Sequence, residues 1–166
     1  MSIYKTINKL LDETNGMIID FLPKRIESEN YFQLEPYYLS TYIDTFASKI
    51  INIIIKLIHN YEAHIYITET PKALPEKWNH ITGKDLSAYS LEEIKELIEY
   101  VIKNDISSLH FLLYENNTPF MLSINGEFSV DLHGTQKKDI ELIELLVHQE
   151  GLFLRSCYCP NQNTTP

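Results

Sequence analysis

The chain contains few cysteines and few glycines, and each shortage argues against a class of protein. Its only cysteines, Cys157 and Cys159, lie two positions apart near the C-terminus. That spacing cannot build a disulfide framework, and a metal site would need further ligands at suitable distances. We therefore expect free thiols in a reducing compartment. The five glycines form neither a glycine-rich phosphate-binding loop nor a G-x-S-x-G nucleophile turn.

No apolar run is long enough to cross a membrane. The most apolar stretch, residues 50–58, contains Asn52 and Lys56, whereas a membrane-spanning helix needs roughly 20 apolar residues. The N-terminal sequence from Met1 to Lys5 also lacks the basic and then apolar pattern of a secretory signal. We therefore expect a cytoplasmic protein without membrane contact.

Positive charge is scarce. The chain has 14 Lys and Arg against 23 Asp and Glu, for a formal net charge of −9. Residues 85–155 hold thirteen acidic against five basic residues, while residues 1–84 hold ten against nine. Nucleic-acid binding depends on a basic surface that contacts phosphates, so no nucleic-acid partner is expected. A charge concentrated in this way favours association with a basic protein.

The rest of the composition is that of an ordinary globular protein, with 44% hydrophobic and 22% charged residues. A chain of this length buries roughly 70% of its unfolded surface, which is enough for a core of its own. We expect one α+β domain over residues 1–159 and a flexible C-terminal tail at 160–166. An antiparallel sheet is expected around a three-stranded meander at about 109–132, with helices mainly on one face.

Apolar periodicity predicts four helices, at about 3–15, 37–60, 91–103 and 137–150. Ser2 and Gly16 suit the two ends of the first helix, and Pro36 suits the start of the second. A buried strand over residues 50–58 stays open as an alternative, because Ile53, Ile54 and Ile55 are β-branched. The third helix is the best specified, since Ser90 and Glu93 form a capping-box pattern.

Three further strands are expected outside the meander, at 17–22, 63–68 and 152–158. Between the second of these and the third helix runs a long connection, residues 69–89, with Leu74 and Trp78 as its anchors. Strand order cannot be read from the sequence.

The meander is predicted at about 109–115, 119–124 and 128–132, with a turn at Asn125-Gly126. A two-residue turn there would mix apolar and polar faces. Sliding the strands by one residue pairs Ile124 with Phe128 and Leu122 with Val130, which matches apolar side chains. We therefore predict that register, with a longer loop or a bulge beside Gly126.

Residues with catalytic or metal-binding potential are scattered. The six histidines show no metal-binding spacing. Asp131 and His133 lie two apart on a predicted strand, where an acid could orient an imidazole. Cys157 could act as a nucleophile with His133 or His148 as its base. Ordinary hydrogen-bonded histidines and inert thiols are the favoured interpretation, so no metal, cofactor or catalytic residue is predicted.

These observations favour a non-enzymatic acidic binding protein. We expect it to dock on a basic partner protein, with the immunity proteins or antitoxins of toxin systems as the favoured class, because inhibition by a charged surface needs no catalytic group. The helix at 91–103 has an acidic face, and the competing interpretation of this face is a solvated surface without a partner. The predicted partner-binding residues are Glu92, Glu96, Glu99, Tyr100, Asp105 and Glu115.

Two alternative functions rest on other features. The helix at 137–150 is apolar over more than half its circumference between Ile140 and Val147, which would suit a homodimer with a structural or regulatory role. An enzyme with an unrecognised site is the other alternative, and a deep pocket with perturbed titratable groups would favour it.

Overall fold

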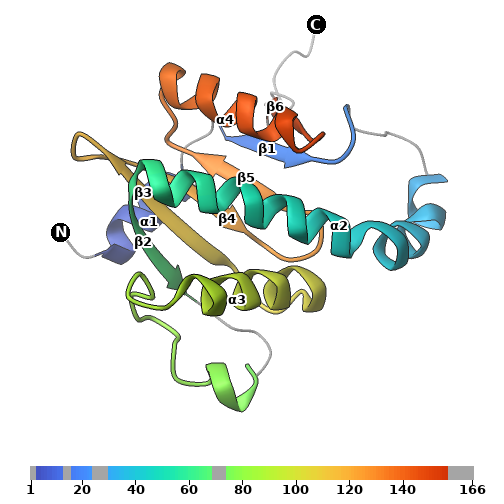
Figure 1. Cartoon of the computed structure of the whole chain (residues 1–166), viewed down its shortest axis with the longest axis horizontal. Helices are drawn as coiled ribbons and strands as arrows, with labels where there is room; N and C mark the ends of the chain where they lie inside the picture. The colour runs from blue at the N-terminus through green and yellow to red at the C-terminus, as the bar shows by residue number, and fades with distance from the viewer. Residues whose placement is uncertain (1–2, 13–15, 24–29, 69–73, 157–166) are drawn as a thin grey trace, which may run out of the picture.

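The chain folds as one α+β domain around a six-stranded antiparallel sheet (Figure 1). The computed structural model describes residues 3–12, 16–23, 30–68 and 74–156. Its strands, in sheet order, are β2 (Glu62–Ile67), β3 (Leu109–Glu115), β4 (Thr118–Ile124), β5 (Val130–His133), β1 (Met17–Asp20) and β6 (Phe153–Ser156). The helices within the described residues are α1 (Ile3–Leu11), α2 (Asn30–Asn60), the short 3-10 helix η1 (Glu76–Trp78), α3 (Leu91–Asn104) and α4 (Lys137–Gln149).

The two faces of the sheet are covered unequally, as predicted. Side chains alternate along a strand, so Phe111 and Leu113 of β3 enter the main core with α2, α3 and α4. Leu112 points the other way and joins a smaller cluster with Ile7 and Leu10 of α1. The three long helices lie over one face, and α1 lies behind the sheet (Figure 1). Much of the α1 side of the sheet is therefore left to polar groups.

Helix α2 is longer than predicted, and the expected start at Pro36 is wrong. The helix begins at Asn30, so Pro36 lies inside it. Proline there removes one backbone hydrogen bond of the helix, and the Pro36 side chain is exposed. Residues 50–58 are helical, because Ile50, Ile54 and Leu57 recur at helical spacing and are buried in the main core.

Helix α1 spans Ile3–Leu11, and the amide of Asp12 bonds to the carbonyl of Asn8 at 3.0 Å, while residues 13–15 of the predicted helix lie outside the described residues. Gly16 therefore precedes β1 and does not end the helix, and Ser2 lies outside the described residues.

Helix α3 has the predicted capping box, in which Ser90 accepts from the amide of Glu93. Leu91 is an exception to the predicted apolar face, being 42% exposed.

The meander is confirmed, but its predicted register is wrong by two residues. Ile124 pairs with Val130 and Leu122 with Leu132, so residues 125–129 form the longer loop that the apolar matching required. Phe128 leaves the ladder because its ring packs on Phe21 and Phe46, with centroids 4.6 and 5.1 Å apart. A shift of two residues keeps every side chain on its own face, so face matching alone cannot detect it.

The described part of the connection after β2, residues 74–89, packs against the domain. Trp78 is 3% exposed, and Leu74 packs against the main core, as predicted for these anchors. The amides of Gly83 and Leu86 each donate to a carbonyl of β2 at 2.8 Å, so the connection covers that edge of the sheet.

At the other edge, β1 is two residues shorter than predicted and pairs with β6. Residues 157 and 158 of the predicted last strand lie outside the described part of the chain, as do Cys159 and the tail at 160–166. No helix among the described residues is long and apolar enough to span a bilayer.

Candidate functional site

The glutamates predicted to bind a partner are exposed on α3, but each has a lysine beside it. Glu92 lies 2.8 Å from Lys95, and Glu99 lies 2.5 Å from Lys103. Glu96 pairs with Lys77 in the same way. Exposed pairs of this kind contribute little to stability, yet each lysine reduces the negative charge that a partner would meet, although Lys103 is shared between Glu99 and Asp44.

The remaining predicted residues do not join them in one patch. Tyr100 is half-buried on α3. Glu115 ends β3 and pairs with Lys138 of the α4 region. Asp105 caps the end of α3 just before β3. At roughly 3.4 Å per residue, the length of β3 separates Asp105 from Glu115 by roughly 20 Å. The six residues therefore belong to different surfaces.

Asp105, at the end of α3, lies in a hollow that comprises two cavities. Two cavities of about 630 and 350 Å³ share Asp105 and Asn125 in their walls. We call the first, between α1 and the sheet, the inner cavity, and the second, beside the β4–β5 loop, the outer cavity. The inner cavity is lined mainly by Tyr4, Ile7, Leu11, Thr68, Ser108 and His110. Volumes of this size suit a small ligand or a protruding side chain.

The floor of the inner cavity contains a chain of hydroxyl and imidazole groups. His110 is 2% exposed, with its Nδ1 2.8 Å from Ser123 Oγ and its Nε2 3.1 Å from Thr68 Oγ1. Burial, with a smaller contribution from the charge of His133, lowers the pKa of His110 to about 4. The imidazole is therefore neutral at neutral pH, with one nitrogen donating and the other accepting.

A second polar chain connects the inner cavity to the outer one. Ser108 Oγ donates to Asn125 Oδ1 at 2.9 Å, and Asn125 Nδ2 donates to Asp131 Oδ2 at 2.6 Å. Burial raises the pKa of Asp131, against the opposing effects of His133 and the Asn125 amide. Strand alternation places Asp131 and His133 on one face of β5, as the sequence predicted. The hydrogen bond found for Asp131 comes from Asn125.

The outer cavity is acidic. Its lining includes five carboxylates and one guanidinium, contributed by Asp20, Glu35, Asp105, Glu127, Asp131 and Arg155. Arg155 forms an ion pair with Asp20. No lysine lines this cavity within the described residues. In contrast to the α3 glutamates, Glu35 and Asp131 have no described lysine or arginine as an ion-pair partner.

Aromatic side chains border the outer cavity and continue onto the surface of α2. Phe21 and Phe128 line the cavity, and Phe21 lies 5.4 Å from Tyr38, measured between ring centroids. Tyr38 in turn lies 5.8 Å from Tyr42. Tyr37 and Tyr42 are 56% and 43% exposed. The position of these rings beside the acidic cavity depends on the fold, because Phe21 and the tyrosines of α2 come from different elements.

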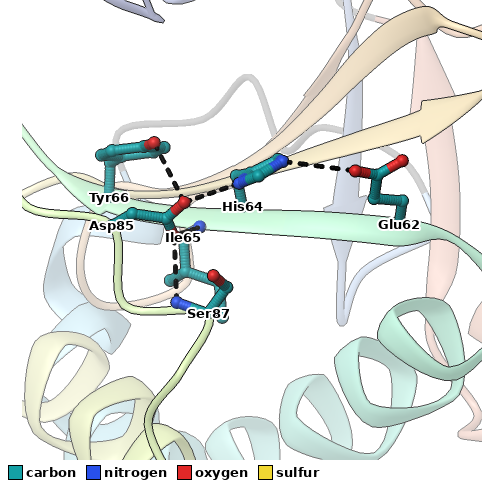
Figure 2. Close-up of polar contacts among 6 residues, drawn as sticks. All are labelled: Glu62, His64, Ile65, Tyr66, Asp85 and Ser87. Atoms are coloured by element: carbon teal, nitrogen blue, oxygen red, sulfur yellow. Dashed lines mark hydrogen bonds and ion pairs between the residues drawn. The ribbon is translucent and has the colours of Figure 1, made fainter.

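A separate polar cluster holds the long connection against β2 (Figure 2). Asp85 accepts hydrogen bonds from the Ile65 amide at 3.3 Å and the Tyr66 hydroxyl at 3.2 Å, and its Oδ2 lies 2.6 Å from His64 Nδ1. Glu62 approaches the other nitrogen of His64 at 3.6 Å.

Two opposing effects act on the Asp85 carboxyl. Partial burial alone would raise its pKa, but the hydrogen bonds from His64, Ser87 and Ile65 lower the pKa to about 2. Burial and the Asp85 charge raise the pKa of Tyr66 to about 12. The ionised carboxylate thus fastens the connection to the sheet edge, a structural role.

The candidate role of Cys157 as a nucleophile falls outside the part of the chain that the structure describes. Cys157 and Cys159 lie outside the described residues. Within the described part, no group of three or more His, Cys, Asp or Glu side chains is placed to hold a metal ion.

Comparison with known proteins adds nothing to the functional assignment, which therefore rests on the geometry described above. The chain matches no protein-family model, and neither the curated proteins nor the solved structures compared with it show a significant match.

Proposed function

We propose that the chain is a non-enzymatic binding protein whose acidic surface docks on a basic protein partner. The observation that carries this proposal is the outer cavity, with five carboxylates and one guanidinium in its described lining. Fields of one sign in a concave site attract partners of opposite charge and raise the rate of association. An immunity or antitoxin role is the class that this chemistry suits, because blocking a basic toxin requires a surface and no reaction.

A salt titration with the product of the adjacent gene tests the proposal. We expect a 1:1 complex whose association rate constant falls at least about tenfold between about 50 and 500 mM salt, because screening removes electrostatic steering. If the adjacent gene product is toxic to cells that express it, their protection by this chain would support the immunity role. Failure to form a complex, or an association rate independent of salt, would contradict the proposal.

Self-association is a second candidate, motivated by α4. The structure buries Ile143, Leu146 and Val147 within the chain and leaves Leu145 55% exposed. The apolar surface that remains is smaller than the sequence suggested. Sedimentation equilibrium at micromolar concentration decides this candidate, because a strictly monomeric chain would eliminate it.

An enzyme is a third candidate, which the inner cavity favours. His110 with a lowered pKa and Asp131 with a raised pKa lie on the sheet face beside the two cavities, and perturbed groups in clefts are typical of active sites. Each His110 nitrogen lies within hydrogen-bond distance of one hydroxyl, that of Ser123 or that of Thr68. Because Thr68 lines the inner cavity, it is the hydroxyl that His110 would activate. A hydrolysis screen comparing the wild type with Thr68→Val would reveal such an activity.

A further inference from the structure

We propose that the outer cavity and the tyrosines of α2 form one docking surface that receives an arginine side chain of the basic partner. This inference rests on the proposed function and names the chemistry by which the partner is recognised. Its anchors are two carboxylates, Glu35 and Asp131, and the aromatic rings of Phe21 and Phe128, all in the lining of the same cavity.

The carboxylates supply the charge. Asp131 is partly buried, and its described hydrogen-bond donor is the neutral amide of Asn125 at 2.6 Å. An ionised carboxylate removed from water gains most from a cation that replaces its lost hydration. Glu35 reaches the same cavity from α2. An entering cation therefore meets carboxylates from two sides.

The aromatic rings favour arginine over lysine. Phe21 and Phe128 pack together with ring centroids 4.6 Å apart, beside the carboxylates. A guanidinium is planar and weakly hydrated, so it can stack on an aromatic face and bind a carboxylate through two N–H groups. An ammonium keeps its hydration more strongly and lacks that flat surface. The cavity volume of about 350 Å³ leaves room for such a group.

The tyrosines supply the contact area around the cavity. Tyr37 and Tyr42 are 56% and 43% exposed, their rings lie 6.3 Å apart, and Tyr38 links them to Phe21. The N-terminal part of α2 projects beyond the sheet (Figure 1), so this part of the helix has room for a partner beside it. Tyrosine is frequent among residues that carry binding energy at protein interfaces.

The exposed face of α3 provides the matched comparison. Glu92 and Glu96 carry the same formal charge as Glu35 and Asp131, but each pairs with a lysine of this chain. Neutralising either set removes the same formal charge. A surface that acts only through net charge would respond equally to both changes, whereas an arginine pocket responds to one.

The test uses N-acetyl-arginine amide as the probe, followed by amide chemical shifts of the whole protein. We expect shifts centred on Phe21 and on residues 126–129, and binding at least about fivefold tighter than N-acetyl-lysine amide or the uncharged N-acetyl-citrulline amide. The double variant Glu35→Gln with Asp131→Asn should weaken arginine binding at least about fivefold. The control with Glu92→Gln and Glu96→Gln should bind as the wild type does. Shifts centred on α3, or equal weakening by both double variants, would overturn the inference.

A second measurement separates this inference from the proposed function. Replacing Tyr37 and Tyr42 with alanine should weaken the complex with the basic partner at least about tenfold, while the chain keeps its fold and its arginine-probe site. If a salt-dependent complex forms but neither the tyrosine nor the Glu35/Asp131 variant weakens it, the docking surface is wrong and the proposed function stands. If the arginine probe binds as expected and no basic protein does, the proposed function is wrong and the arginine site stands.

Discussion

Gly126 and Asp105 come into backbone contact where α3 meets the β4–β5 loop. A Cβ atom on Gly126 would lie 2.8 Å from the Cα of Asp105, and Gly126 has φ of +91°. Beside this contact, the amide of Glu127 donates to the carbonyl of Ile102 at 2.8 Å. The end of α3 is thereby joined to the loop, and Asp105 is held in the wall that the two cavities share.

Gly126→Ala should destabilise the protein by about 2 kcal/mol or more, because the new methyl group meets the Cα and the carboxylate of Asp105 and the φ value disfavours an L side chain. Chemical denaturation measures the loss. Gly151→Ala is the matched control, since Gly151 also has a positive φ but its Cβ would meet only the flexible end of Lys49, at 3.4 Å. A smaller loss is expected there. Equal losses would show that strain alone, without the Asp105 contact, explains the effect.

His110 should make stability depend on pH. The unfolded imidazole has a pKa of about 6.5 and the folded one about 4, so between these values the unfolded chain binds a proton that the folded chain does not. The free energy of unfolding should therefore be full above pH 6.5 and fall by roughly 3 kcal/mol as the pH drops to about 4. Urea denaturation at a series of pH values measures this slope.

The variant His110→Gln removes the titrating group and should flatten the slope in that range, whatever its effect on stability at neutral pH. Direct titration of the His110 ring by NMR gives an independent check in the wild-type protein. A folded-state pKa close to that of an ordinary histidine would contradict the buried, neutral imidazole.

Asp85 should act at lower pH and in the same direction. Its folded pKa of about 2 lies below the ordinary 3.8, so its contribution is present above pH 3.8 and lost as the pH falls towards 2. With a third of the side chain exposed, Asp85→Asn should cost only about 1 kcal/mol at neutral pH. It should also speed hydrogen exchange at the amides of Gly83 and Leu86, which bond to β2.

Glu62→Gln is the control for that prediction, because the Glu62 side chain is 75% exposed and lies 3.6 Å from His64. We expect a stability change within about 0.5 kcal/mol and no change in exchange at Gly83 or Leu86. Similar exchange in both variants would show that Asp85 does not fasten the connection.

Local signals predicted the elements well where they were complete. The Ser90 and Glu93 capping box and a continuous apolar face placed α3 correctly, since both depend on residues within a few turns. The helix start predicted from Pro36 was wrong. Proline prefers the first turn of a helix, but this preference does not exclude a position further along an exposed helix end. The loop after Ile124 was expected to be long, but its length depended on Phe128 packing against Phe21 and Phe46.

The candidate site was harder to predict, because its charge is not contiguous in sequence. The acidic run on α3 was conspicuous, yet lysines of the same surface pair with three of its glutamates, Glu92, Glu96 and Glu99. Of the predicted residues, Asp105 alone lines the hollow. Asp131 was predicted to lie beside His133, but nothing in the sequence placed Asp131 and the tyrosines of α2 beside one cavity.

The sequence by itself determined the α+β class, the long helices and the meander, because apolar periodicity and helix caps act between residues close in the chain. The tertiary structure alone decided where the acidic groups meet. Glu35, Asp105 and Asp131 come from α2, the end of α3 and β5. Strand order and strand register bring these residues together, and neither is encoded locally. The register can shift by two residues without moving any side chain to the other face.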